Sequence, residues 1–261
     1  TQDDAHVFCR ESHVKEEIEK VWDIIIAFYQ RVGFTLDTRL SLRNPKEQKK
    51  YLGSSKTWKA AEQKLRELAK EKRVIAQEAP GEAAFYGPKI DFMAHDALGR
   101  EWQVATIQLD MNQPERFDLF CIDENGKKER IVMLHAAIMG SLERFISLLI
   151  EHYAGAFPVW LAPVQAIVLP ISEKFQEYAK EVFHELRDHN IRAELDSSNE
   201  TLGKKIREHE LQKIPYLLVV GEREQQSKNI SIRERGAGDK GQMMIQNFID
   251  KVSAENKLPH A

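Results

Sequence analysis

Apolar residues recur at helical spacing near the start of the chain. Five of them lie three or four positions apart, and Gly33 follows as a stop signal, so a helix is predicted over residues 11–32. The stripe consists of Val14, Ile18, Val21, Ile25 and Phe28. Before this helix, residues 1–9 alternate between polar and less polar positions, which is typical of a strand.

The pattern up to residue 157 predicts a sheet with flanking helices. Strands are expected at residues 34–42, 85–94, 101–110 and 128–135, and helices at residues 57–72 and 140–153. The polar stretch 44–55 predicts a surface loop, and Asp-Glu-Asn-Gly at 123–126 predicts a hairpin turn. Runs of strands that precede helices favour an α+β domain built on an antiparallel sheet.

The organisation changes after residue 157. Residues 157–163 contain two prolines and resemble a linker. Strands and helices then alternate. Strands are predicted at 165–170, 192–196, 216–220 and 230–235, and helices at 173–189, 201–214 and from 246 onward. This order predicts an α/β domain with crossover helices. The predicted domains are therefore 1–157 and 158–261.

Composition narrows the class of protein without assigning a function. The 261 residues are 42% hydrophobic and 30% charged, which is typical of a globular protein, and the net charge of −3 disfavours a wholly basic nucleic-acid binder. Two cysteines are too few for a disulfide framework. No apolar run approaches the roughly 20 residues of a membrane span, and no signal peptide is visible. We therefore expect a cytoplasmic protein that does not contact a membrane.

The first strand carries unusual chemistry on one face. Gln2, Asp4, His6 and Phe8 alternate, so they share a side of the strand, and such polar residues form a pocket wall rather than a core. His135 ends a later strand, and Arg144 lies on the helix that follows it. Two imidazoles, a carboxylate and a guanidinium favour a metal-assisted site for an anionic ligand.

Six segments, in order, resemble the threonyl-tRNA synthetase family of class II synthetases. They are TQDDAH (1–6), FYGPK (85–89), WQVATIQLD (102–110), HAAIMGSLERF (135–145), AGAFPVWLAPVQ (154–165) and KIREHELQKIPYLLVVG (205–221). The resemblance implies an incomplete α+β class II catalytic core with an antiparallel sheet, followed by an α/β anticodon-binding domain with a mixed sheet. It also implies that other family motifs lie upstream of Thr1.

The resemblance implies one zinc ion per subunit. His6 and His135 match two of its ligands, and the third is expected to be a cysteine upstream of this sequence. Cys9 lies three positions from His6 and faces the other side of a regular strand. Cys121 stands at a position that the family does not use. Both cysteines are predicted to be small buried hydrophobic residues instead.

The family also implies roles for residues that bind substrate. Gln2, Asp4, Tyr86 and Ser141 are expected to bind threonine. Gln103, Thr106 and Arg144 are expected to bind ATP, which enters with Mg²⁺. Arg144, Lys89 and Gln108 are the expected catalytic residues, with Arg144 in the third class II motif. Regular alternation places Gln103 on the opposite face from Thr106 and Gln108, so all three reach one ligand only if a bulge intervenes.

The second domain is expected to read the anticodon. Asn199, Glu224 and Arg233 match positions that contact anticodon bases in the family. Lys213 matches a basic position near the same surface and is also expected to bind the anticodon. Lys204, Lys205 and Arg207 would then hold phosphates, although basic residues on a helix are more often a solvated face.

The function implied by the resemblance is threonine–tRNA ligase, with ATP, L-threonine and tRNA(Thr) as substrates and a homodimer as the assembly. An alternative is a non-catalytic tRNA-binding fragment or a regulatory paralogue. A synthetase for proline or glycine is disfavoured by the pair His6 and His135.

Overall fold

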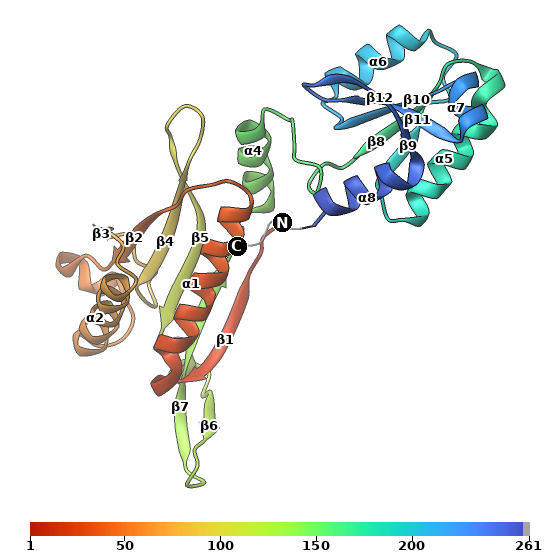
Figure 1. Ribbon diagram of the computed structural model, residues 1–261. Helices are drawn as coiled ribbons and strands as arrows, with labels where there is room; N and C mark the ends of the chain where they lie inside the picture. The colour runs from red at the N-terminus through yellow and green to blue at the C-terminus, as the bar shows by residue number, and fades with distance from the viewer. Residues whose placement is uncertain (258–261) are drawn as a thin grey trace. The chain divides into compact units, whose positions relative to one another are not determined.

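The computed structural model describes residues 1–257, and the chain forms two compact units. The first unit spans Thr1–Leu149 and the second begins at Ile150, so the division falls before the predicted boundary after residue 157. Each unit is a sheet with helices packed against it (Figure 1). None of the helices in the described part of the chain is long and apolar enough to cross a membrane.

The first unit contains a seven-stranded sheet in the order β1-β7-β5-β4-β2-β3, with β6 paired to β7. Its elements are β1 (Ala5–Arg10), η1 (Glu11–His13), α1 (Val14–Arg31), β2 (Asp37–Leu42), η2 (Pro45–Lys50), α2 (Ser55–Glu71), β3 (Ala76–Pro80), β4 (Lys89–His95), β5 (Glu101–Asp110), α3 (Gln113–Arg116), β6 (Phe120–Ile122), β7 (Lys128–Ala137) and the larger part of α4 (Leu142–Tyr153). The predicted antiparallel sheet is confirmed, except that β2 and β3 run parallel. The strand β3 was missed.

Helix α1 buries a stripe that differs slightly from the predicted one. Val14, Ile18 and Ile25 are buried as predicted, but Trp22 and Tyr29 complete the stripe. Val21 and Phe28 are only half-buried. The reason is the 3.6-residue period, because positions 14, 18, 22, 25 and 29 stay in line over four turns. Trp22 packs edge-on against Phe92 of β4, with ring centroids 4.9 Å apart.

Three local predictions need correction. The first strand begins at Ala5 rather than Thr1, because Gln2 makes only an isolated bridge with Ser141. The predicted loop at 44–55 contains the 3₁₀ helix η2, whose start is capped by the side chain of Asn44. Cys9 and Cys121 are half-buried rather than buried. The hairpin turn at 123–126 is confirmed, and Gly126 adopts a positive φ of 75° there.

The second unit is a five-stranded sheet in the order β12-β11-β10-β8-β9. Its elements are β8 (Ala166–Pro170), η3 (Glu173–Phe175), α5 (Gln176–Asp188), β9 (Ala193–Leu195), α6 (Leu202–Leu211), β10 (Tyr216–Val220), α7 (Glu222–Ser227), β11 (Asn229–Glu234), β12 (Gly238–Met244) and α8 (Ile245–Glu255). Strands β9, β8 and β10 are parallel and the rest antiparallel, so the predicted mixed sheet is confirmed.

The two faces of this second sheet bury different helices. Tyr178 and Val182 of α5 share a core with Leu218 of β10 and Phe248 of α8. On the opposite face, Ile206 of α6 packs with Ile167, Leu169 and Leu217. Helix α6 therefore lies over β8 and β10.

Candidate functional site

Strand register aligns four of the predicted site residues in one row. His6 of β1 lies opposite His135 of β7, His135 lies opposite Gln108 of β5, and Gln108 lies opposite Lys89 of β4. Directly opposed residues of antiparallel strands project from the same face of a sheet. Side chains that are far apart in the sequence therefore form one continuous surface across four strands.

The two histidines at one end of this row contact each other. Their ring centroids are 4.6 Å apart, and Nε2 of His135 lies 2.9 Å from Oδ2 of the fully buried Asp110. A carboxylate behind a histidine fixes the orientation of its ring, an arrangement that is common around metal ligands. Sequence analysis missed Asp110, whose only signal was an acidic residue at the end of an otherwise apolar strand.

No third ligand accompanies this pair in the described part of the chain. Among residues 1–257, no group of three His, Cys, Asp or Glu side chains could hold a metal ion. Cys9 lies on the side of β1 that faces α1, where burial and the charge of Glu17 raise the pKa of its thiol. The donor set therefore fits half of a zinc site, namely two imidazoles, which are ordinary zinc ligands.

Tyr86 and Gln108 lie beside the histidines. The Tyr86 hydroxyl donates a hydrogen bond to Oε1 of Gln108, and its ring lies 4.8 Å from that of His135. Burial, together with the charges of Asp110 and Asp4, raises the pKa of Tyr86. The phenol therefore stays neutral and keeps its donor proton.

Asp91 is the centre of the other end of the site, and sequence analysis missed it as well. This buried carboxylate accepts hydrogen bonds at Oδ1 from Thr106 (2.7 Å) and Gln103 (2.9 Å). At Oδ2 it accepts a hydrogen bond from Ser41 (2.6 Å) and pairs with Nζ of Lys89 at 3.1 Å. A charged residue between two apolar neighbours in a strand was the available signal.

The bulge expected in β5 is present. Phe92 pairs with Ala105, whereas the next residue, Met93, pairs with Gln103, so Val104 is the extra residue. The shift brings Gln103 to the same carboxylate as Thr106, although regular alternation would separate them.

Arg144 is tied to this end of the site through the backbone. Its NH1 donates to the Gln103 carbonyl over 3.1 Å, and its guanidinium lies 5.6 Å from the centre of the Trp102 ring. The Arg144 amide is capped by Oγ of Ser141, which in turn lies beside Gln2 through their isolated bridge. The predicted residues Gln2, Ser141 and Arg144 are thus brought together at the start of α4.

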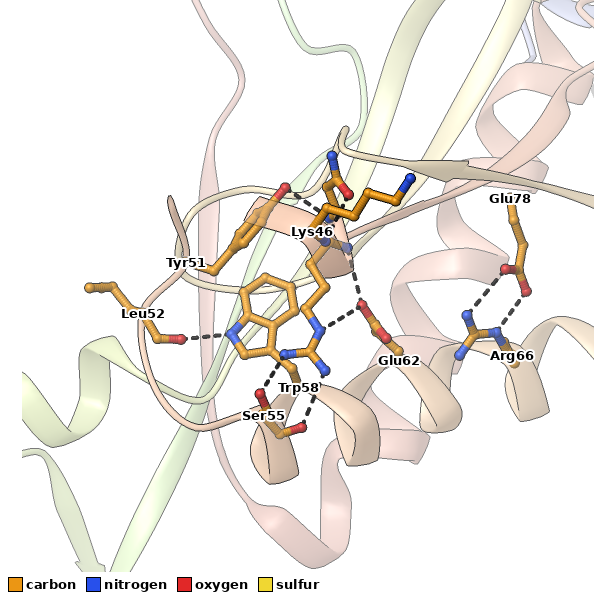
Figure 2. A network of polar contacts seen from close by, with 10 residues as sticks. Lys46, Tyr51, Leu52, Ser55, Trp58, Glu62, Arg66 and Glu78 are labelled. Atoms are coloured by element: carbon orange, nitrogen blue, oxygen red, sulfur yellow. Dashed lines mark hydrogen bonds and ion pairs between the residues drawn. The ribbon is translucent and has the colours of Figure 1, made fainter. Parts of the chain in front are cut away.

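The loop that carries Tyr86 is held from two sides. Figure 2 shows the first contact on one side, between Trp58 and Leu52. Trp58 of α2 is 2% exposed, and its Nε1 donates to the Leu52 carbonyl over 2.6 Å. The Leu52 amide in turn donates to the Phe85 carbonyl over 2.7 Å. From the other side, the Asn112 side-chain amide donates to the Tyr86 carbonyl over 2.6 Å. These bonds fix the backbone on which the Tyr86 ring is presented.

A buried ion pair supports Trp58. The Arg43 amide donates to Oε1 of Glu62 over 3.1 Å, and the Arg43 side chain lies 3.8 Å from the same oxygen. The guanidinium also lies 5.8 Å from the centre of the Trp58 ring. Next to this cluster, a Cβ at Gly87 would lie 1.9 Å from the Leu109 carbonyl oxygen, so only glycine fits there.

In the second unit, the predicted anticodon residues fall into separate places. Lys213 and Arg233 line one cavity of about 590 Å³ together with Glu210, whose carboxylate lies 3.5 Å from NH2 of Arg233. Nε of Arg233 is buried and has no hydrogen-bond partner in the described structure. Asn199 lines a different cavity of about 380 Å³ beyond the ends of β8 and β9.

Glu224 is held by its own domain. Its carboxylate accepts hydrogen bonds from Ser231 (2.7 Å), Gln242 (2.8 Å) and the Gly221 amide (3.0 Å). Burial alone would raise the pKa of Glu224, but these hydrogen bonds outweigh it and keep the pKa below its ordinary value. The side chain is therefore a fixed, charged acceptor at the start of α7.

The expectation that Lys205 holds a phosphate at the surface is wrong. Lys205 is 3% exposed, and its Nζ donates to the Asp196 carbonyl over 3.0 Å. The cause is the docking of α6, which turns Lys205 toward the sheet. Lys204 points outward and pairs with Glu200 and Glu208.

Comparison with known proteins agrees with both units. Residues 1–153 match the family described as tRNA synthetase class II core domain (G, H, P, S and T), and residues 165–255 match the family described as anticodon binding domain. The chain is 50% identical over 256 residues to a threonine–tRNA ligase of Porphyromonas gingivalis and 49% identical to one of Phocaeicola vulgatus.

These matches cover 98% of this chain but only 39% and 40% of the two relatives, so the chain spans about 40% of their length. A crystal structure of the RNA binding domain of threonyl-tRNA synthetase from Cryptosporidium parvum Iowa II superimposes with a TM-score of 0.92 at 40% identity. That match covers the whole of this chain and 64% of the other. The chain belongs to the class II aminoacyl-tRNA synthetase family, and in it a class II core region is followed by an anticodon-binding region.

Proposed function

We propose that this chain is part of a threonine–tRNA ligase, which activates L-threonine with ATP and transfers it to the 3′ end of tRNA(Thr). The observation that carries the proposal is the single row from His6 through His135 and Gln108 to Lys89. It places paired imidazoles at one end and a cation at the other, which suits an amino acid beside a nucleotide phosphate. Sequence identities of 50% and 49% to proteins named threonine–tRNA ligase support threonine as the amino-acid substrate.

The imidazole end is proposed as the threonine site, with His6 and His135 as two ligands of a zinc ion. Zinc would supply a Lewis acid that accepts the amino group and the side-chain hydroxyl of threonine. An apolar pocket separates near-isosteric valine and threonine only by roughly 10²-fold. Coordination of the hydroxyl gives a stronger basis for selection, because valine has no such group.

The remaining threonine contacts surround these histidines. Asp4 would accept a hydrogen bond from the threonine hydroxyl, and its charge already acts on Tyr86. Gln2, Tyr86 and Ser141 would border the amino acid. Asp110 would keep the His135 ring in place through their 2.9 Å contact.

The cationic end is proposed as the ATP site. Arg144 and Lys89 would stabilise charge that develops on phosphate oxygens, with Mg²⁺ carried by the nucleotide. Gln103 and Thr106 would line the nucleotide pocket, and Gln108 would join the two halves. In the structure, Asp91 holds the side chains of Lys89, Gln103 and Thr106 in place.

The second unit is proposed to bind the anticodon loop of tRNA(Thr). Bases of a single-stranded loop can be read on their edges by amide, carboxylate and guanidinium groups. Asn199, Glu224, Arg233 and Lys213 supply these groups together with an ammonium. We further propose a homodimeric enzyme that works in the cytoplasm.

One test separates this proposal from its alternatives. ATP–pyrophosphate exchange is measured for the full gene product that contains these residues, with threonine, serine, valine, proline and glycine. Exchange that is strongest with threonine supports the ligase. Strongest exchange with proline or glycine would replace the substrate. Binding of tRNA without any exchange would favour the non-catalytic alternative, which the two-imidazole donor set also allows.

Zinc binding gives an independent prediction. We expect residues 1–261 to bind zinc weakly, because they supply two imidazoles and no third ligand among the described residues. A titration with Zn²⁺, or with Co²⁺ followed by visible absorption, measures the affinity.

His6→Ala and His135→Ala should each abolish binding, and Asp110→Asn should weaken it about 10–100-fold. His13→Ala, an exposed histidine, is the control. Tight stoichiometric zinc that disappears on Cys9→Ala would contradict the ligand assignment.

A further inference from the structure

Asp196 organises the end of the second sheet. It directly follows β9, and its amide donates to the Val168 carbonyl of β8 over 3.1 Å. One carboxylate oxygen accepts hydrogen bonds from the amide (2.9 Å) and the hydroxyl (2.5 Å) of Ser198. The other lies 2.9 Å from Nε2 of His209. Nζ of Lys205 donates to the Asp196 carbonyl and lies 3.8 Å from the first carboxylate oxygen.

This group is nearly closed to solvent. The side chains of Lys205, Asp196 and His209 are 4%, 12% and 14% exposed. Buried lysines occur almost only when they are paired, because an uncompensated charge is costly to desolvate. Burial would raise the pKa of Asp196, but hydrogen bonds from Ser198 and His209 and the charge of Lys205 keep it below its ordinary value. A charged Asp196 therefore holds both α6 side chains.

The arrangement clamps a short loop at both ends. Residues 197–200 run from Asp196 to Thr201, whose side chain accepts a hydrogen bond from the Lys204 amide and begins α6. Lys205 and His209 are one helical turn apart on α6, so they reach Asp196 from the same helix face. Asn199 lies inside this loop and lines the 380 Å³ cavity together with Lys205.

We propose that Lys205 and His209 are positioning residues for base recognition by Asn199. This inference rests on the proposed function of the second unit as an anticodon reader. A short amide side chain discriminates bases only if its backbone is fixed to within a fraction of an ångström. Surface loops are mobile unless other groups hold them. Asp196, Lys205 and His209 together hold the loop rigid. The charged side chains that face solvent remain available to attract RNA.

The test compares two neighbouring lysines in the full chain. Lys205→Met and Lys204→Met are assayed with transcripts of tRNA(Thr) and an anticodon-swapped tRNA(Thr) over a range of salt concentrations. Lys205→Met should lower the discrimination ratio about fivefold or more, which is the loss of one good base contact. The salt slope, which is the change in the logarithm of the tRNA affinity with the logarithm of the salt concentration, should match that of the parent. Lys204→Met should keep the discrimination ratio. The salt slope of this variant should fall by no more than the value for about one phosphate contact.

His209 provides the second arm. His209→Leu removes the donor to Asp196 and should lower discrimination like Lys205→Met. His209→Gln retains an N–H at similar reach and should restore it. Hydrogen exchange should accelerate at residues 197–200 in Lys205→Met and His209→Leu, while β8 and β10 remain protected.

Each outcome decides the inference. Full discrimination by Lys205→Met, or a salt slope that falls by about one phosphate contact in Lys205→Met, would overturn it and restore a phosphate role. Loss of protection across the whole second sheet in both Lys205→Met and His209→Leu would make the cluster a fold determinant only, and would also overturn it. If the parent chain itself binds both transcripts equally, the anticodon-reading function fails, and the inference fails with it.

Discussion

Replacing Arg144 by alanine in the full gene product that contains these residues is expected to lower the proposed ATP–pyrophosphate exchange about 10²–10³-fold, the usual cost of losing one preorganised transition-state contact. The structure gives the reason for preorganisation, because the guanidinium is held by the Gln103 carbonyl at 3.1 Å and lies over the Trp102 ring. Gln103 in turn reaches the Asp91 cluster. Steady-state and single-turnover exchange kinetics measure the effect.

Three controls make this result specific. Arg116→Ala removes an exposed arginine of α3 and should leave exchange unchanged. Binding of tRNA to Arg144→Ala should stay close to that of the parent, because the proposed anticodon residues lie in the second unit. Stability should change by no more than about 0.5 kcal/mol, as is usual for an exposed side chain. Exchange within a few-fold of the parent would remove Arg144 from the proposed catalytic residues.

Replacing Trp58 by alanine is expected to destabilise the first unit by about 3–5 kcal/mol. The indole is almost completely buried, and it lies 5.0 Å from the Tyr51 ring. It donates a hydrogen bond to the Leu52 carbonyl (Figure 2). The Leu52 amide in turn donates to the Phe85 carbonyl, next to Tyr86. The loss therefore combines a large cavity with release of the segment behind the proposed threonine site.

Urea denaturation measures this loss. Trp160 lies in the second unit, so in a Trp160→Phe background the Trp58 variants retain Trp22 and Trp102 as fluorescent reporters of the first unit. Trp58→Phe keeps most of the packing and should cost far less, with about 1 kcal/mol for the lost hydrogen bond. Lys59→Ala on the exposed side of α2 should change stability by at most about 0.5 kcal/mol. If the free energy of unfolding of Trp58→Ala lay within about 1 kcal/mol of the parent value, the packing around Trp58 would not depend on the indole.

The sequence by itself determined the local structure of most of the chain. Period-3.6 and period-2 patterns predict α1, the main antiparallel strands and most of the alternating strands and helices of the second unit, because these patterns depend only on neighbouring residues. The short helix α7 and the strand β12 were not predicted. Motif matches also selected residues that the structure brings together, such as Gln2 with Ser141 and Lys89 with Gln108. The errors in which residues of a helix face the core were small. In the buried stripe of α1, for example, Trp22 takes the place of Val21.

Only the tertiary structure decided which side chains meet. Strand register sets His6 opposite His135, and the bulge at Val104 brings Gln103 to Asp91. Neither follows from local patterns, because register is fixed by pairing between segments distant in the sequence. Asp91 and Asp110 were missed for the same reason, since their partners come from other strands.

The adjacent lysines of α6 show this division most clearly. Lys204 and Lys205 have the same side chain and the same helical backbone, so the sequence predicts similar roles. In the structure one is exposed and paired with glutamates, while the other is buried against Asp196. Successive residues of a helix point about 100° apart, and the docking of α6 on the sheet determines which of the two directions faces the protein.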